Sequence, residues 1–166
     1  IVMDMHSRKK IAIIGGGAVG SITALYLANL GYQVTLIDPT LKQEKTNMPL
    51  NASQASLGVL MGYVYRRSTG RSWRLRKRSM ELWPKLISLL NHNRCNLKIE
   101  TPLIQLTTTE KEASFMKHLA EERKELGIEL LNKDATEYFN TILETKLFGG
   151  IISHLDGRIN PKILIP

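Results

Sequence analysis

Residues 9–38 of this chain read KKIAIIGGGAVGSITALYLANLGYQVTLID, and this stretch decides the fold. Ile11 to Ile14 form a short continuous apolar run, which is typical of a strand buried on both faces of a parallel sheet. Residues 18–30 favour a helix, and Gly31 follows as a C-terminal stop. Residues 34–37 are a second β-rich run. The order predicts a strand–helix–strand unit of the Rossmann type.

Three glycines where the first strand passes into the helix, Gly15, Gly17 and Gly20, have the spacing G-x-G-x-x-G. Gly15 permits the tight turn out of the strand, and Gly17 lets the backbone approach a pyrophosphate closely. Gly20 lets the helix lie against the strand. The free N–H groups at the helix start, together with the positive end of the helix dipole, favour a phosphate anion.

Asp38 closes the second strand 18 residues after Gly20. A carboxylate at this position can accept hydrogen bonds from a ribose diol, and its charge disfavours a 2′-phosphate. The stretch therefore predicts a site for an ADP moiety. FAD and NAD share that moiety, so this unit alone leaves the choice between them open.

The next informative stretch is NASQASLGVLMGYVY, residues 51–65. Its small side chains allow close backbone approach, and the hydroxyls of Ser53 and Ser56 can bind phosphate oxygens. An NAD-dependent dehydrogenase would more often continue with alternating strands and helices here. The alternative is a surface loop that leads into a strand at Val59.

The chain resembles the N-terminal part of the D-amino-acid-oxidase family of FAD-dependent oxidoreductases, which includes glycine oxidase and sarcosine oxidase. Five pieces occur in the family order and together span nearly all of residues 10–164. They are IAIIGGGAVG, VTLID, ASQASLGVL, TPLIQLTTTEKEA and GGIISHLDGRINPKIL.

The resemblance implies a set of FAD-binding residues. Those that line the pyrophosphate would be Gly15, Gly17, Ala18, Val19 and Gly20. Those beside the adenosine ribose would be Asp38 and Pro39. Those that run along the pyrophosphate toward the isoalloxazine would be Ala52, Ser53, Leu57, Gly58 and Val59. Val59 and Met61 would lie nearest to the reacting face.

The resemblance also implies an activity. The cofactor would be FAD, and the substrate a small amine or amino acid whose C–N bond is oxidised. A hydride would pass to flavin N5, the imine would hydrolyse, and O₂ would reoxidise the flavin to give H₂O₂. Catalytic and substrate-binding residues are expected beyond Pro166. The alternatives are an NAD-dependent dehydrogenase and a dinucleotide-binding module without catalysis.

The expected fold class is α/β: a Rossmann-type FAD/NAD(P)-binding domain with the start of an α+β substrate domain. Residues 1–62 would form the cofactor-binding unit, 63–148 part of the substrate domain, and 149–166 a segment that returns to the first domain. The chain starts at Ile1 and stops at Pro166 just after an element begins. We therefore expect a fragment of a longer protein, inactive by itself.

The charge of the chain is concentrated in one patch. Lys and Arg number 23 and Asp and Glu 15, and seven of the basic residues lie between Arg66 and Arg78 with no acid among them. The rest of the chain is nearly neutral, which disfavours a uniformly basic nucleic-acid binder. Because Trp73 lies in the patch, a flavoprotein that acts on tRNA is a third hypothesis. A solvated helix face is the favoured interpretation.

Several other classes of protein are disfavoured. A single cysteine, Cys95, forms no internal disulfide and predicts a reducing, cytoplasmic setting. No apolar stretch is long enough to span a membrane. The histidines share no ligand spacing with each other or with Cys95, so no metal site is expected (His6, His92, His118 and His154). The sequence does not indicate an oligomeric state.

Beyond the basic patch, the pattern predicts a helix from Trp73 to Leu90, with a kink or a fresh start at Trp83-Pro84. A strand over 101–108 and a capping box at Thr109 and Glu112 follow. The capped helix would run to Leu126. A strand over 128–131 and one helix turn capped by Asp134 with Glu137 come next. The pattern ends with a strand over 151–153 and a turn at Asp156-Gly157.

Overall fold

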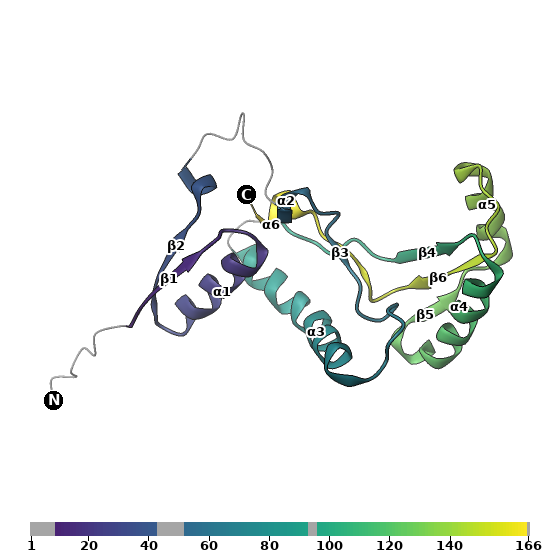
Figure 1. Ribbon diagram of the computed structural model, residues 1–166, viewed down its shortest axis with the longest axis horizontal. Helices are drawn as coiled ribbons and strands as arrows, with labels where there is room; N and C mark the ends of the chain where they lie inside the picture. The colour runs from purple at the N-terminus through teal and green to yellow at the C-terminus, as the bar shows by residue number, and fades with distance from the viewer. Residues whose placement is uncertain (1–8, 43–51, 93–95, 166) are drawn as a thin grey trace. The chain divides into compact units, whose positions relative to one another are not determined.

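The computed structural model describes residues 9–42, 52–92 and 96–165 (Figure 1). The chain divides into two compact units. Unit 1 comprises Ile1–Leu57 and Asn160–Pro166, and unit 2 comprises Gly58–Ile159. The expected ranges 1–62, 63–148 and 149–166 differ from this division. Residues 149–159 belong to unit 2 because the strand Gly149–Ser153 pairs with two strands of that unit.

Unit 1 contains the predicted strand–helix–strand unit. Strand β1 (Lys10–Ile14) and strand β2 (Gln33–Ile37) pair in parallel, with Ile11 opposite Val34 and Ile14 opposite Ile37. Helix α1 (Ala18–Asn29) connects them and ends before Gly31, which has a φ of +88°. Three short elements complete the unit: η1 (Pro39–Lys42), α2 (Ala52–Ala55) and α6 (Pro161–Leu164).

Unit 2 is a mixed α+β structure. Its main sheet has the antiparallel order β4-β6-β5. The strands are β4 (Leu103–Thr107), β5 (Ile128–Leu130) and β6 (Gly149–Ser153). A second antiparallel pair joins β3 (Val59–Leu60) to β7 (Gly157–Arg158). The helices are α3 (Gly70–His92), α4 (Glu110–Glu122), η2 (Lys124–Leu126) and α5 (Lys133–Leu143).

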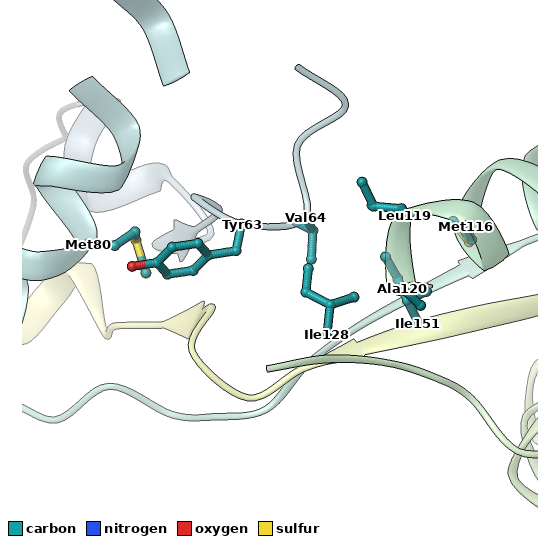
Figure 2. Close-up of a cluster of buried hydrophobic side chains, with 8 residues drawn as sticks. All are labelled: Tyr63, Val64, Met80, Met116, Leu119, Ala120, Ile128 and Ile151. Atoms are coloured by element: carbon teal, nitrogen blue, oxygen red, sulfur yellow. The ribbon is translucent and has the colours of Figure 1, made fainter. Parts of the chain in front are cut away.

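The core of unit 2 is a cluster of eight buried hydrophobic residues from the loop after β3 and from α3, α4, β5 and β6 (Figure 2). They are Tyr63, Val64, Met80, Met116, Leu119, Ala120, Ile128 and Ile151. Figure 2 shows Tyr63 beside Met80 and Val64 beside Ile128. The loop after β3 thus contributes directly to the core.

Helix α3 differs from its prediction. It runs without a break from Gly70 to His92 with Pro84 inside it, so the predicted fresh start is wrong. Proline removes one backbone hydrogen bond from a helix. Met80 is buried in the core cluster, and Trp73 and Trp83 pack against it. Burial of these large side chains on one side of the helix offsets the missing bond.

The second half of unit 2 confirms some local predictions and corrects others. Thr109 caps α4 by accepting a hydrogen bond from the backbone N of Glu112 at 3.3 Å, as predicted. The predicted helix to Leu126 is divided into α4 and η2, with Arg123 between them. Gly127 ends η2 in the left-handed conformation.

The cap of α5 was assigned to the wrong residue. Asn132, and not Asp134, is the N-cap, because its Oδ1 accepts a hydrogen bond from the backbone N of Ala135 at 2.8 Å. The helix has 11 residues, whereas the sequence predicted a single turn.

The predicted turn at Asp156-Gly157 is also wrong. Gly157 pairs with Leu60 in the β3–β7 ladder, and the side chain of Asp156 is completely buried. The carboxylate accepts hydrogen bonds from the backbone at residues 62–64, which keeps it away from solvent.

Candidate cofactor site

The glycine loop between β1 and α1 is closed tightly. Gly15 has a φ of +102°, a backbone conformation that residues with a side chain rarely adopt. Its N–H donates to the carbonyl of Ile37 at 2.8 Å. A Cβ on Gly20 would lie 1.8 Å from the carbonyl oxygen of Gly15. Only glycine at position 20 therefore permits this approach of α1 to the loop.

Asp38 lies against the same loop. Its Oδ2 accepts a hydrogen bond from the backbone N of Gly16 at 2.6 Å, and the residue is half-buried. A Cβ on Gly16 would lie 3.0 Å from the Cβ of Asp38. Sequence reasoning assigned no role to Gly16, although the run of three glycines is the signal that could have revealed one.

Ser53 reaches the start of α1 from α2. Its Oγ accepts a hydrogen bond from the backbone N of Ala18 at 3.0 Å and would lie 3.1 Å from a Cβ on Gly17. Gly17, the N-cap of α1, provides no side-chain cap. Among the described residues, the amides of Val19 and Gly20 have no hydrogen-bond acceptor. The helix start therefore presents free N–H groups beside a serine hydroxyl.

The structure brings half of the predicted site residues together in unit 1. The residues joined by these contacts and close approaches are Gly15, Gly17, Ala18, Gly20, Asp38 and Ser53. The other predicted residues of unit 1 are exposed: Val19, Pro39, Ala52 and Leu57. Gly58 and Val59 belong to unit 2, as does Met61.

The residues of unit 1 fit the ADP part of a dinucleotide. At positions 17 and 20 a Cβ would crowd Ser53 or the loop itself, so glycine there allows α1 to pack closely against the loop and α2, as in dinucleotide-binding loops. The first turn of α1 contains no acidic residue to repel a pyrophosphate. The charge of Asp38 is suited to a ribose diol and unsuited to a 2′-phosphate. This geometry accommodates FAD and NAD equally.

A comparison with protein families decides which group the chain belongs to. Residues 10–166 match the DAO family of FAD-dependent oxidoreductases. The chain belongs to this family. The match confirms the family resemblance inferred from the five sequence pieces.

Solved structures of this family are similar to the chain. Glycine oxidase from Geobacillus kaustophilus is 26% identical with a TM-score of 0.72, over 95% of this chain and 42% of that chain. Glycine oxidase from Bacillus cereus ATCC 14579 is 23% identical with a TM-score of 0.67, over 95% and 41%. Iminodiacetate oxidase from Chelativorans sp. BNC1 is 20% identical with a TM-score of 0.65, over 93% and 42%.

The DAO-family chain therefore spans about two fifths of the length of these three enzymes. None of the curated protein sequences matches it significantly.

Base stacking on the basic patch, residues 66–78, would require the ring of Trp73 to be free. Trp73 is half-buried, with its ring edge-on to Tyr63 at 6.3 Å between centroids and the guanidinium of Arg123 at 5.0 Å. Arg76 lies over the ring of Tyr65 at 3.8 Å. Trp73 is therefore engaged inside unit 2, and the hypothesis of base stacking on it loses its support.

Metal and membrane features are absent from the part of the chain that the structure describes. No group of three or more metal-ligating side chains occurs among those residues. None of their helices is long and apolar enough to cross a membrane. His6 and Cys95 lie outside the described residues.

Proposed function

We propose that this chain binds FAD, with the ADP part of the cofactor on the glycine loop of unit 1. The observation that carries the proposal is the junction at the start of α1. There Gly20 allows contact with the loop, Ser53 bonds to the Ala18 amide, and Asp38 bonds to Gly16. This junction combines free amides, a helix dipole and a ribose-compatible carboxylate.

We assign the pyrophosphate to the backbone around the start of α1 and the adenosine ribose to Asp38. The full set of proposed FAD-binding residues comprises Gly15, Gly17, Ala18, Val19, Gly20, Asp38, Pro39, Ala52, Ser53, Leu57, Gly58 and Val59. The free amides of Val19 and Gly20 support the pyrophosphate assignment, since a phosphate oxygen is the acceptor that a helix start favours.

For the whole protein we propose oxidation of the C–N bond of a small amine or amino acid, with O₂ as the electron acceptor. Bound FAD would supply the hydride acceptor for this reaction. The proposal is supported by family membership and by neighbours that are named glycine oxidase and iminodiacetate oxidase. The same membership favours FAD over NAD and over a module without catalysis.

The residues of this chain would bind and orient the cofactor, and we assign no catalytic group to them. Two side chains of unit 1, those of Asp38 and Ser53, each accept a hydrogen bond from a backbone amide of the loop or of the helix start, which suits them to holding a cofactor. We therefore expect the 166-residue chain, loaded with FAD, to form little or no H₂O₂ from glycine, sarcosine or D-alanine. Sustained H₂O₂ formation would contradict this.

A competition titration tests the cofactor choice. The chain is titrated with FAD, ADP, NAD and NADP by calorimetry, and the last three are then used to displace FAD. FAD is expected to bind most tightly, ADP to compete with it, and NADP to fail because its 2′-phosphate meets Asp38. Tighter binding of NAD than of FAD would favour the dehydrogenase alternative. Asp38→Asn is expected to weaken ADP binding, and Glu144→Gln, at an exposed position of unit 2, is the matched control.

A further inference from the structure

A cavity of unit 2 lies between α4, the end of β5, the start of α5 and the start of β6, which are neighbours in the ribbon (Figure 1). Its volume is about 450 Å³, and small-molecule sites have volumes of roughly 300–1,000 Å³. All of its lining residues belong to unit 2, and none of them has a part in the proposed FAD site. We call it the α4–α5 cavity.

The floor of the α4–α5 cavity is apolar and is fixed by backbone hydrogen bonds. Leu131 and Leu147 are each 8% exposed, and Gly150 is buried. The N–H of Leu131 donates to the carbonyl of Gly150 at 2.9 Å. The N–H of Leu147 donates to Oδ1 of Asn140 at 2.7 Å, which ties the segment before β6 to α5. The floor therefore has a defined shape without a ligand.

The space above this floor depends on two small residues. Gly149 has a φ of +144°, a backbone conformation that residues with a side chain rarely adopt. A Cβ on Gly149 would lie 3.9 Å from the Cβ of Ala113 on α4. A long side chain at either position would project into the space between α4 and β6. Gly149 and Ala113 thus leave room for a ligand.

The charged side chains around the cavity are cationic. Lys117 of α4 and Lys133 of α5 line it and are exposed, so they lie at its rim. Phe148 also lines it, and Nζ of Lys146 lies 4.9 Å from the centroid of the Phe148 ring. Among the described residues, no carboxylate lines the cavity. Glu137 approaches Lys133 only loosely, at 3.9 Å between Oε1 and Nζ, and both side chains are exposed. The rim therefore favours an anion.

Two hydroxyl groups line the cavity as well. The Thr136 hydroxyl donates its proton to the carbonyl of Asn132 at 2.9 Å, so it has no proton left for a ligand. The Ser114 hydroxyl has no hydrogen-bond partner within the described ranges, and it is exposed. Ser114 and the two rim lysines can thus all donate to the oxygens of one anion.

The chemistry of the lining restricts the class of ligand. An apolar floor favours a ligand with an apolar body, and the cationic rim favours a negative charge at one end of it. A ligand ammonium group would meet two lysines and no lining carboxylate. A phosphate at the start of α5 is disfavoured, because Oδ1 of Asn132 already accepts from the Ala135 amide at 2.8 Å. These conditions leave a carboxylate without an amino group.

We propose that the α4–α5 cavity binds a small carboxylic acid anion that has an apolar body and no amino group. The carboxylate lies at the rim, where Lys117, Lys133 and Ser114 are its donors. The apolar body lies on the floor formed by Leu131 and Leu147. This inference goes beyond the proposed function, because it requires no FAD and involves unit 2 alone.

Three probes of one skeleton test the ligand class: 3-phenylpropanoate, its neutral amide 3-phenylpropanamide, and phenylalanine, which adds an ammonium group. Each is titrated without FAD into the ¹⁵N-labelled 166-residue chain, and the amide resonances are followed by NMR. We expect 3-phenylpropanoate to shift the amides of Leu131, Gly149 and Gly150 with a dissociation constant of about 1 mM. The amide and phenylalanine should each bind about tenfold more weakly.

Substitutions at the rim test the site. Lys117→Gln and Lys133→Gln should each raise the dissociation constant of 3-phenylpropanoate by about threefold, and the double variant by about tenfold. Lys111→Gln is the matched control, because Lys111 is an exposed lysine of α4 that does not line the cavity. It should bind the probe like the unaltered chain.

Each contrary outcome overturns a defined part of the inference. Equal binding of 3-phenylpropanoate and its amide would show that the rim does not recognise a carboxylate. Equal binding of phenylalanine would show that an amino group is accepted. Shifts confined to amides outside the cavity, or no shifts at a probe concentration of about 20 mM, would show that the cavity is not the site. Because FAD is absent from these titrations, their results are independent of the proposed function.

Discussion

The missing Cβ of Gly20 decides how closely α1 approaches the glycine loop. In Gly20→Ala the new carbon would lie 1.8 Å from the carbonyl of Gly15, so helix and loop must separate. Overpacking of this kind costs about 1–3 kcal/mol of the free energy of unfolding, and the cofactor cradle should lose its shape. FAD titration should show no binding, whereas Thr23→Ala, an exposed change in the same helix, should bind FAD normally.

Ser53 contributes one hydrogen bond to the start of α1. Replacing it by alanine leaves the Ala18 amide without its acceptor, which should lower the free energy of unfolding by about 1 kcal/mol. Denaturant unfolding measures this change. Ser56→Ala is the control, since the Ser56 hydroxyl donates to the Ser53 carbonyl at 2.8 Å in an exposed position. Equal losses in the two variants would contradict the role of the Ser53 side chain.

The buried phenol of Tyr63 should make unit 2 less stable at alkaline pH. Burial raises the pKa of Tyr63 above its ordinary value, and the charges of Glu81 and Asp156 raise it further. Above about pH 10 the unfolded chain ionises this phenol while the folded chain keeps it neutral, so stability falls as pH rises. Tyr63→Phe should show a shallower fall, measured by denaturant unfolding at a series of pH values. Tyr138→Phe, at a position that is 62% exposed, should behave like the unaltered chain.

At the start of helix α5 the structure has Asn132 as the N-cap, whereas the sequence pattern indicated Asp134. Asn132→Ala removes the cap bond to Ala135 and should cost about 1 kcal/mol of the free energy of unfolding. Asp134→Ala removes only a charge in the first turn and should cost about 0.3–0.5 kcal/mol. A larger effect of the second substitution would show that Asp134 is the cap after all.

Elements governed by local rules could be predicted from the sequence. Gly31 and Gly127 end their helices, and Thr109 caps α4, because each of these depends on a few neighbouring residues. The bond from Ala18 to Ser53 spans 35 positions and that from Gly62 to Asp156 spans 94. Such contacts form only when tertiary packing brings the segments together. For the same reason the Asp156-Gly157 pair, which looks like a surface turn, is a buried anchor.

The buried hydrophobic residues are divided very unequally between the two units. Of those in the described residues, Ile165 alone belongs to unit 1. A two-stranded sheet with so little buried surface is marginally stable. We therefore expect amides of β1 and β2 to exchange faster than those of β4 and β6. Saturating FAD should slow the exchange in unit 1, because a ligand stabilises the state that it binds. Equal protection of the two units without FAD would contradict this.

The visible absorption spectrum of the chain after incubation with FAD and gel filtration tests the central claim most directly. We predict that the two visible flavin bands elute with the protein at about one FAD per chain, and that Gly20→Ala abolishes them. If all of the flavin elutes with the small molecules, and equilibrium titration also shows no binding, the assignment of the glycine loop, Asp38 and Ser53 to FAD is wrong.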